Sequence, residues 1–109
     1  MNLLGLKQKL EKGKSLGGDV IYIKEENILY GLECIYEDQE NKSITLLKSK
    51  EESIKVEDFI KVLDKLYANI GDKEVFIGKD ENNRNDKKEI KSVEFAQYEL
   101  LKMLFINVE

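Results

Sequence analysis

The stretch Val56 to Ile77 (VEDFIKVLDKLYANIGDKEVFI) constrains the fold more than any other part of the chain. Its apolar residues recur at three- and four-residue steps, which places them on one face of a helix. These residues are Phe59, Ile60, Leu63, Leu66, Tyr67 and Ile70. Gly71 predicts the helix end, because glycine readily takes the conformation needed there. Glu74 to Ile77 then alternates like a strand, so we expect helix and strand to share a core.

Before this helix, the chain predicts a shorter helix followed by three strands. Leu3 to Lys12 carries leucines at helical spacing, and we expect Gly13 and the Gly17-Gly18 pair to end this helix. Three runs rich in β-branched and aromatic residues follow, separated by polar turn sequences. They are Asp19 to Lys24, Ile28 to Glu37 and Ser43 to Lys48. The middle run contains Gly31 on the side opposite its apolar residues, and we expect a β-bulge there.

After Ile77, the polar run Gly78 to Lys88 predicts a mobile loop. Glu89 to Tyr98 and Leu101 to Val108 predict two more strands, because β-forming residues stand at both ends of this stretch. Residues 93–104 also fit a helical stripe, so a helix is the alternative. Because Leu101 to Val108 is apolar on both faces, we expect it to lie inside the sheet or to pair across a homodimer interface.

The two halves of the chain, residues 1–52 and 53–109, resemble each other. Leu6 to Ile23 aligns without a gap over Ile60 to Ile77, with glycines and apolar residues in matching places. We predict an α+β fold in which an αβββ unit occurs twice, with an antiparallel sheet and the helices packed on it. The alternative is chance, since helix, glycine, strand is a common order. A length of 109 residues suits a single domain with one core.

Composition argues against several classes of function. The chain has no histidine, so it lacks the usual acid-base group at neutral pH and the commonest metal ligand. A net charge of -4 disfavours non-specific attraction to nucleic acid or to an anionic membrane. Cys34 is the only cysteine and permits no internal disulfide. Because the sequence has no signal-peptide or membrane-spanning run, we predict a cytoplasmic protein, and we predict no cofactor and no metal.

Four short motifs fit ordinary structure better than chemistry. Gly13-Lys14-Ser15 copies the end of a phosphate-binding loop but follows a helix instead of a strand. The run Asp80 to Lys91 has the acids and amides of a calcium loop, but lysine stands where the closing glutamate belongs. Cys34 has no histidine to activate it, so we expect a small core residue. The fourth motif is a basic helix face without interleaved aromatic residues. Its members are Lys7, Lys9, Lys12 and Lys14.

Glu33 and Glu94 are the best candidates for a site, because they occupy equivalent places in the predicted repeat. If they approached one another, one carboxyl group would have a raised pKa and could act as a general acid. The pair would then serve a carboxylate-based enzyme or a small-ligand-binding domain. The alternative is that each side chain points into water, as alternation along its strand predicts.

The apolar spacing of the second half is similar to a unit found in many small proteins of bacteriophages and mobile elements. It reads Val56-x-x-Phe59-Ile60-x-x-Leu63-x-x-Leu66, then Asp72-x-Glu74-Val75-x-Ile77, then Ile90-x-x-Val93. The resemblance brings no catalytic residues and implies an accessory or inhibitor protein. Acidic clusters that converged on one surface could also dock a basic partner. They are Glu25-Glu26, Glu37-Asp38-Glu40 and Glu51-Glu52-Glu57-Asp58. We therefore predict a non-enzymatic protein that binds another protein, as an inhibitor or immunity-type partner.

Overall fold

The two predicted helices form where their apolar spacing placed them. α1 spans Leu3–Ser15 and therefore continues past Gly13, where an end was predicted, and α2 spans Val56–Ile70. Gly71 ends α2 with a φ of 77°, a value that favours glycine. The structure, a computed structural model, describes residues 1–38, 42–50, 53–78 and 86–108, without the side chains of Glu33, Cys34 and Tyr36.

The apolar faces of both helices are buried, with one exception. Tyr67 was predicted on the buried face of α2 but is 38% exposed. A tyrosine tolerates this position because its ring can pack while its hydroxyl stays in water. The fully or largely buried helix residues are Leu3, Leu6, Leu10, Val56, Phe59, Ile60 and Leu63.

Seven strands complete the described part of the fold. They are β1 (Val20–Glu25), β2 (Ile28–Asp38), β3 (Ser43–Ser49), β4 (Ile54–Lys55), β5 (Glu74–Gly78), β6 (Lys87–Tyr98) and β7 (Leu101–Val108). Residues 93–104, for which a helix was the alternative, belong to a β-hairpin. Its turn is Glu99-Leu100, and Glu99 takes a positive φ of 56°. The turn therefore contains none of the glycine or asparagine residues that usually mark such a turn in a sequence.

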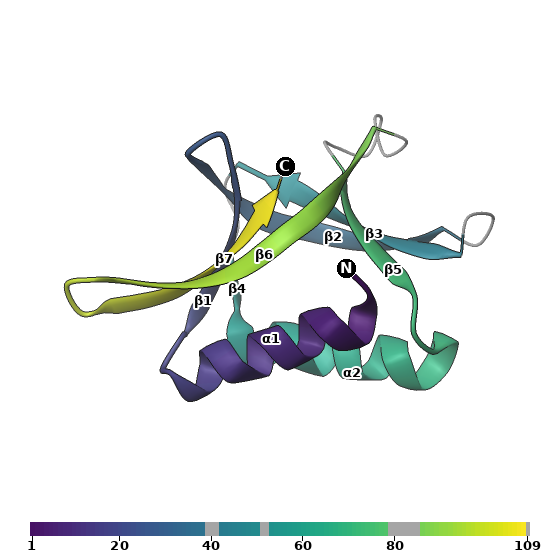
Figure 1. Ribbon diagram of the computed structural model, residues 1–109, viewed down its shortest axis with the longest axis horizontal. Coiled ribbons are helices and arrows are strands. Elements are labelled where there is room, and N and C mark those ends of the chain that lie inside the picture. The colour runs from purple at the N-terminus through teal and green to yellow at the C-terminus, as the bar shows by residue number, and fades with distance from the viewer. Residues whose placement is uncertain (39–41, 51–52, 79–85, 109) are drawn as a thin grey trace.

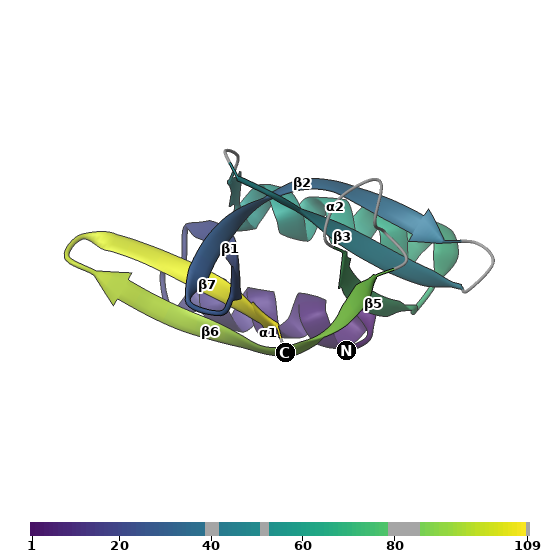
Figure 2. The same cartoon turned by 90° about the horizontal axis from the view of Figure 1, so that it is seen from above.

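The strands close into a ring (Figure 2). Their order is β2-β3-β5-β6-β7-β1, and β1 also pairs with β2. Two long strands each serve two neighbours. β2 pairs with β1 through residues 28–30 and with β3 from residue 31 onward. Likewise, β6 pairs with β5 through residues 87–89 and with β7 from residue 90 onward. The short β4 pairs with β1 outside this ring.

The predicted antiparallel sheet is wrong in two pairings, because the sheet is mixed. β3 runs parallel to β5, and β1 runs parallel to β7. The first of these pairs is parallel because α2 crosses over between its strands, as parallel pairing requires. The strands within each half, β1-β2-β3 and β5-β6-β7, are antiparallel. The duplication of the two halves stays a prediction.

The bulge in β2 lies beyond the predicted position. Gly31 pairs in regular register with Ser49, and the register shifts between Leu32 and Cys34. The alternation predicted from Ile28 to Tyr36 is therefore broken around residue 33. A second shift occurs in β6, between Ile90 and Ser92. Both shifts fall in the strands that change partners, where extra twist and bending are needed to turn a corner.

The two helices lie together across one end of the ring (Figure 1). Their apolar rows meet the inward side chains of the strands in one buried cluster, which makes a single compact α+β domain. The strands contribute Ile21, Ile23, Leu32, Ile44, Leu46, Val75, Ile77, Ile90, Leu104 and Ile106. Neither described helix has the length and apolar character needed to cross a membrane.

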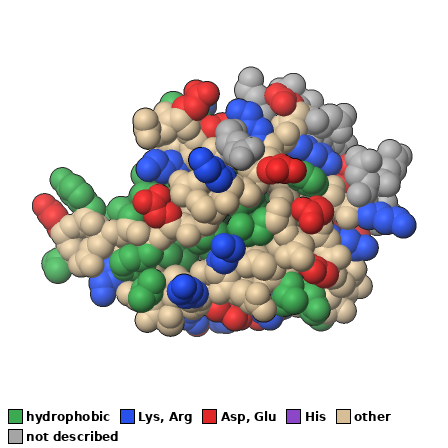
Figure 3. Space-filling view, viewed as in Figure 1, with side chains coloured by type: hydrophobic (Ala, Val, Ile, Leu, Met, Phe, Trp, Pro, Cys, Tyr) green, Lys and Arg blue, Asp and Glu red, His purple; other side chains and the backbone are tan. Residues whose placement is uncertain are grey.

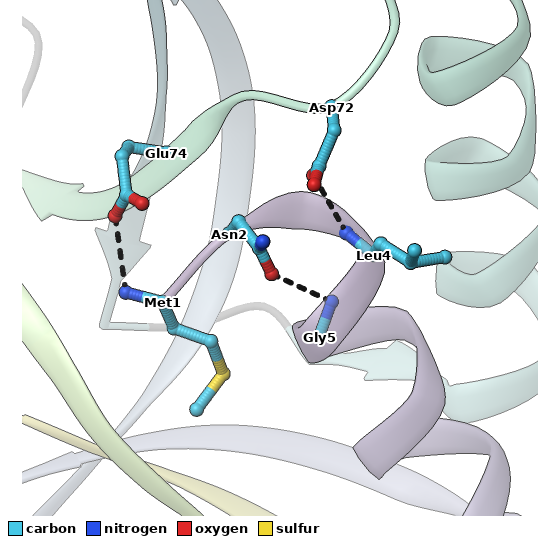
Figure 4. Close-up of polar contacts among 6 residues, drawn as sticks. All are labelled: Met1, Asn2, Leu4, Gly5, Asp72 and Glu74. Atoms are coloured by element: carbon cyan, nitrogen blue, oxygen red, sulfur yellow. Dashed lines mark hydrogen bonds and ion pairs between the residues drawn. The ribbon is translucent and has the colours of Figure 1, made fainter.

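The first turn of α1 is held by the segment that leads into β5 (Figure 4). The Leu4 N–H donates to the Asp72 carboxylate at 3.0 Å. Asn2 caps the helix, and its side chain accepts a hydrogen bond from the Gly5 N–H at 2.9 Å. Because α1 has no acidic residue in its own first turn, Asp72 supplies the negative charge that favours the positive end of the helix dipole.

Of the predicted mobile loop, only part can be compared with the structure. Gly78 ends β5, and Lys87 and Lys88 begin β6. Residues 79–85 lie outside the described residues. The strand that follows the loop therefore begins two residues earlier than predicted.

We expect Gly13→Val to destabilise the protein, because α1 passes directly over β7 at this residue. A Cβ atom at Gly13 would lie 2.5 Å from Cδ2 of Leu104, which is fully buried and cannot move aside. Overpacking should lower the free energy of unfolding by about 2–3 kcal/mol in urea denaturation. The control Lys9→Val adds the same side chain at an exposed position of α1 and should cost less than about 1 kcal/mol. Equal losses in both variants would contradict the close contact.

Candidate functional site

A charged cluster lies inside the ring, at the end away from the helices. Glu25 is the last residue of β1, and alternation places it inward, after Ile21 and Ile23. Lys48 stands near the end of β3 and Lys88 near the start of β6. Figure 1 shows the β1–β2 turn and the start of β6 at the end of the ring opposite α1 and α2. Three segments that are distant in the sequence therefore meet there.

Glu25 binds both lysines. Its Oε1 accepts a hydrogen bond from Nζ of Lys88 at 2.6 Å, and its Oε2 accepts one from Nζ of Lys48. Glu25 as a whole is only 8% exposed, and the Lys48 side chain is 12% exposed. The Lys48 ammonium also lies 4.6 Å from the centroid of the Tyr30 ring, within the range of a cation–π interaction. A carboxylate this deeply buried needs such partners.

The two lysines determine the protonation of Glu25. Burial alone would raise the pKa of this carboxyl group, but the hydrogen bonds and charges of Lys48 and Lys88 outweigh burial and hold the pKa below its usual value. The pKa of Lys88 is raised, first by its hydrogen bond to Glu25 and by that residue's charge. The charges of Glu26 and Asp86 act in the same direction. Glu25 and Lys88 are therefore both ionised at neutral pH.

The cluster forms one wall of a hollow of about 270 Å³. The lining residues are Glu25, Glu26, Tyr30, Lys48, Asp86 and Lys88. Its walls are mostly polar side chains, with one aromatic ring. The lining therefore provides donors, acceptors and a flat apolar surface within a small volume.

The neighbouring Lys87 does not bind Glu25 but contacts residues of other strands. Its Nζ lies 2.9 Å from Oδ2 of Asp38 and 3.4 Å from Oγ of Ser43. It also lies 5.8 Å from the centroid of the Phe76 ring. Because successive residues of a strand point to opposite faces, Lys87 and Lys88 attach β6 to different parts of the ring.

The predicted pair Glu33 and Glu94 remains untested. Glu33 lies at the register shift of β2, and its side chain is outside the described part of the structure. Glu94 is exposed, and its Oε1 accepts a hydrogen bond from Nδ2 of Asn107 at 3.2 Å. In the ring, two strands separate β2 from β6 in either direction. The two carboxyl groups therefore lie on strands that are not neighbours.

In the predicted basic face of α1, Lys7 contacts the other helix. Nζ of Lys7 lies 2.5 Å from Oδ1 of Asp64 in α2, and this hydrogen bond raises the pKa of Lys7. Lys12 and Lys14 lie in the last turn, where positive charge favours the negative end of the helix dipole. Lys7 therefore has a structural role, as the partner of Asp64.

The β6–β7 hairpin carries the two most exposed large apolar side chains of the described residues, Tyr98 and Leu100, with the exposed Leu101 beside them. Tyr98 is 71% exposed, Leu100 98% and Leu101 45%. Pairing between β7 and β1 begins only at Met103, so the hairpin continues past the ring (Figure 1). In Figure 3, hydrophobic side chains gather at this end of the molecule. We call Tyr98, Leu100 and Leu101 the hairpin tip.

Neither the charged cluster nor the hairpin tip was predicted from the sequence. Glu25 was grouped with Glu26 in a surface acidic cluster, although its place two residues after Ile23 on an alternating strand indicates an inward side chain. Among the described residues, no group of acidic or cysteine side chains is arranged to hold a metal ion. Comparison of the chain with protein-family models, curated proteins and solved structures gives no match.

Glu25→Gln should lower stability at neutral pH and remove part of the sensitivity to acid. The Lys48 side chain is only 12% exposed, and in the variant its ammonium group loses this counter-charge. The loss should lower the free energy of unfolding by about 3 kcal/mol. Because the folded pKa of Glu25 is lowered, its ionisation stabilises the native state above the usual glutamate pKa. That contribution is lost as the pH falls through the pKa of Glu25 in the folded state. The free energy of unfolding of the wild type should therefore approach that of the variant below about pH 4.

Urea denaturation from pH 7 to pH 2 measures this difference. The control Glu94→Gln neutralises an exposed carboxylate and should stay within about 0.5 kcal/mol of the wild type. A constant gap between wild type and Glu25→Gln across this pH range would show that the ion pairs do not act through ionised Glu25.

Proposed function

We propose that the chain is a non-enzymatic protein that binds another protein through the hairpin tip. The observation that carries this proposal is the 98% exposure of Leu100, beside an exposed tyrosine, at the end of a projecting hairpin. Exposed apolar side chains that stand together mark interaction surfaces more often than single ones do. Tyrosine is also among the residues that contribute most to binding energy at protein interfaces.

The shape of the tip favours a partner with an apolar pocket. The tip is convex and is carried by the antiparallel pairing of β6 with β7, which runs from Tyr98 and Leu101 into the ring. A hairpin held in this way loses little conformational freedom on binding. The inhibitor or immunity role expected from the resemblance to phage and mobile-element proteins suits this shape, since a rigid tip can fill a partner's pocket.

The acidic clusters support docking less well than the tip does. Glu25 is buried against two lysines, Asp38 binds Lys87, and Glu57 lies 3.6 Å from Lys61 in α2. Glu40, Glu51 and Glu52 lie outside the described residues. The hypothesis of an enzyme or ligand site at Glu33 and Glu94 requires both carboxylates in one concave pocket, and the exposure of Glu94 disfavours it.

A charge at the tip should strongly reduce capture of the partner protein. In pull-downs from the lysate of the native host, quantified by mass spectrometry, Leu100→Asp should weaken binding by about 2 kcal/mol, or roughly 30-fold. The matched control is Val62→Asp on α2, which introduces the same charge at an apolar residue that is 37% exposed. A partner that is lost equally from both variants, or retained by Leu100→Asp, would contradict the proposal.

Size-exclusion chromatography of the same variants separates this proposal from self-association. A homodimer that Leu100→Asp converts to a monomer would mean that the tip binds a second copy of the chain. A monomer in both forms, with a captured partner, supports binding of a different protein.

A further inference from the structure

The hollow at the open end of the ring has two regions of opposite charge. Its wall contains two ammonium groups, of Lys48 and Lys88, which share the single carboxylate of Glu25. This region therefore carries a net positive charge. Each ammonium has three N–H donors, and only one of each is used on Glu25, so donors remain for a further acceptor.

Two carboxylates form the other region. Glu26 is exposed in the β1–β2 turn, and Asp86 is exposed just before β6. Neither carboxylate forms an ion pair within 4.0 Å among the described residues, although the charge of each raises the pKa of Lys88. They give the hollow a negative rim next to its positive wall.

We infer that this hollow binds a small zwitterion of the free amino acid type. The ligand's carboxylate would accept hydrogen bonds from Lys48 and Lys88, and its ammonium group would bind Glu26 and Asp86. The Tyr30 ring, beside Lys48, would contact the carbon skeleton. A volume of about 270 Å³ limits the ligand to a small molecule.

Charge pairing explains why a zwitterion is favoured over a simple ion. A plain anion at the lysines is repelled by Glu26 and Asp86, which line the same hollow, and a plain cation at these carboxylates is repelled by the net positive wall. A molecule with both groups satisfies both regions. This inference is independent of protein binding by the hairpin tip, which lies on another part of the ring.

Isothermal titration calorimetry with each of the twenty free L-amino acids tests the inference. At least one should bind with a Kd below about 10 mM. Acetate and methylammonium, which each carry one of the two charges, should bind at least tenfold more weakly. Absence of binding by all twenty would overturn the inference, and so would acetate binding as tightly as the best amino acid.

Variants of exposed lining residues locate the binding. Asp86→Asn and Lys88→Met should each raise the Kd of the tightest-binding amino acid about tenfold, which corresponds to the loss of one charged contact. The control Lys91→Met removes a lysine from the same strand that does not line this hollow. Far-UV circular dichroism confirms that each variant is folded. Unchanged affinity in both lining variants, or an equal loss in the control, would overturn the assignment of this site.

Discussion

The rest of the structure depends on the parallel pairing of β1 with β7. It joins residues 20–24 to residues 103–107 and closes the ring between the first strand and the last. Ile21 faces the same interior as Leu104, its partner in the register, and both are fully buried. The pairing also explains why β7 is apolar on both faces without being an aggregation-prone edge. β7 has β6 on one side and β1 on the other, so both of its hydrogen-bonding edges are paired within a single chain. The predicted homodimer is therefore not needed to account for this strand.

Closure of the ring also determines where charge can be buried. One end of the interior is filled by the apolar rows of α1 and α2. At the other end, the described residues place no helix, and the inward position at the end of β1 is occupied by Glu25. A carboxylate in that position is stable only because Lys48 and Lys88 arrive from β3 and β6. Because each of the three residues lies on a different strand, the same ion pairs that allow the burial also hold the open end of the ring together.

The hairpin tip follows from the length of the strands. β6 and β7 pair with each other over their whole described length, but β1 reaches only as far as Met103. Beyond that residue, none of the described strands adds to the hairpin, and Tyr98 and Leu100 stay exposed. Apolar residues at such a position add nothing to the core, and exposing Leu100 to water is unfavourable. The charged hollow and the hairpin tip thus both arise where the described strands and helices leave side chains uncovered.

The sequence alone determined the elements, and the tertiary structure decided how they pair. The helix Val56–Ile70 and the strands around it could be predicted because periodicity is a local property of consecutive side chains. The strand ends at Tyr98 and Leu101 could be predicted too, but the turn conformation of Glu99 could not, because sequence rules do not associate glutamate with a positive φ. The parallel pairings, the bulge after Leu32 and the burial of Glu25 depend on contacts between residues far apart in the chain. A local sequence pattern does not specify which strands become neighbours. Whether Glu25 lies at the surface or in a buried ion pair therefore depends on the closure of the ring.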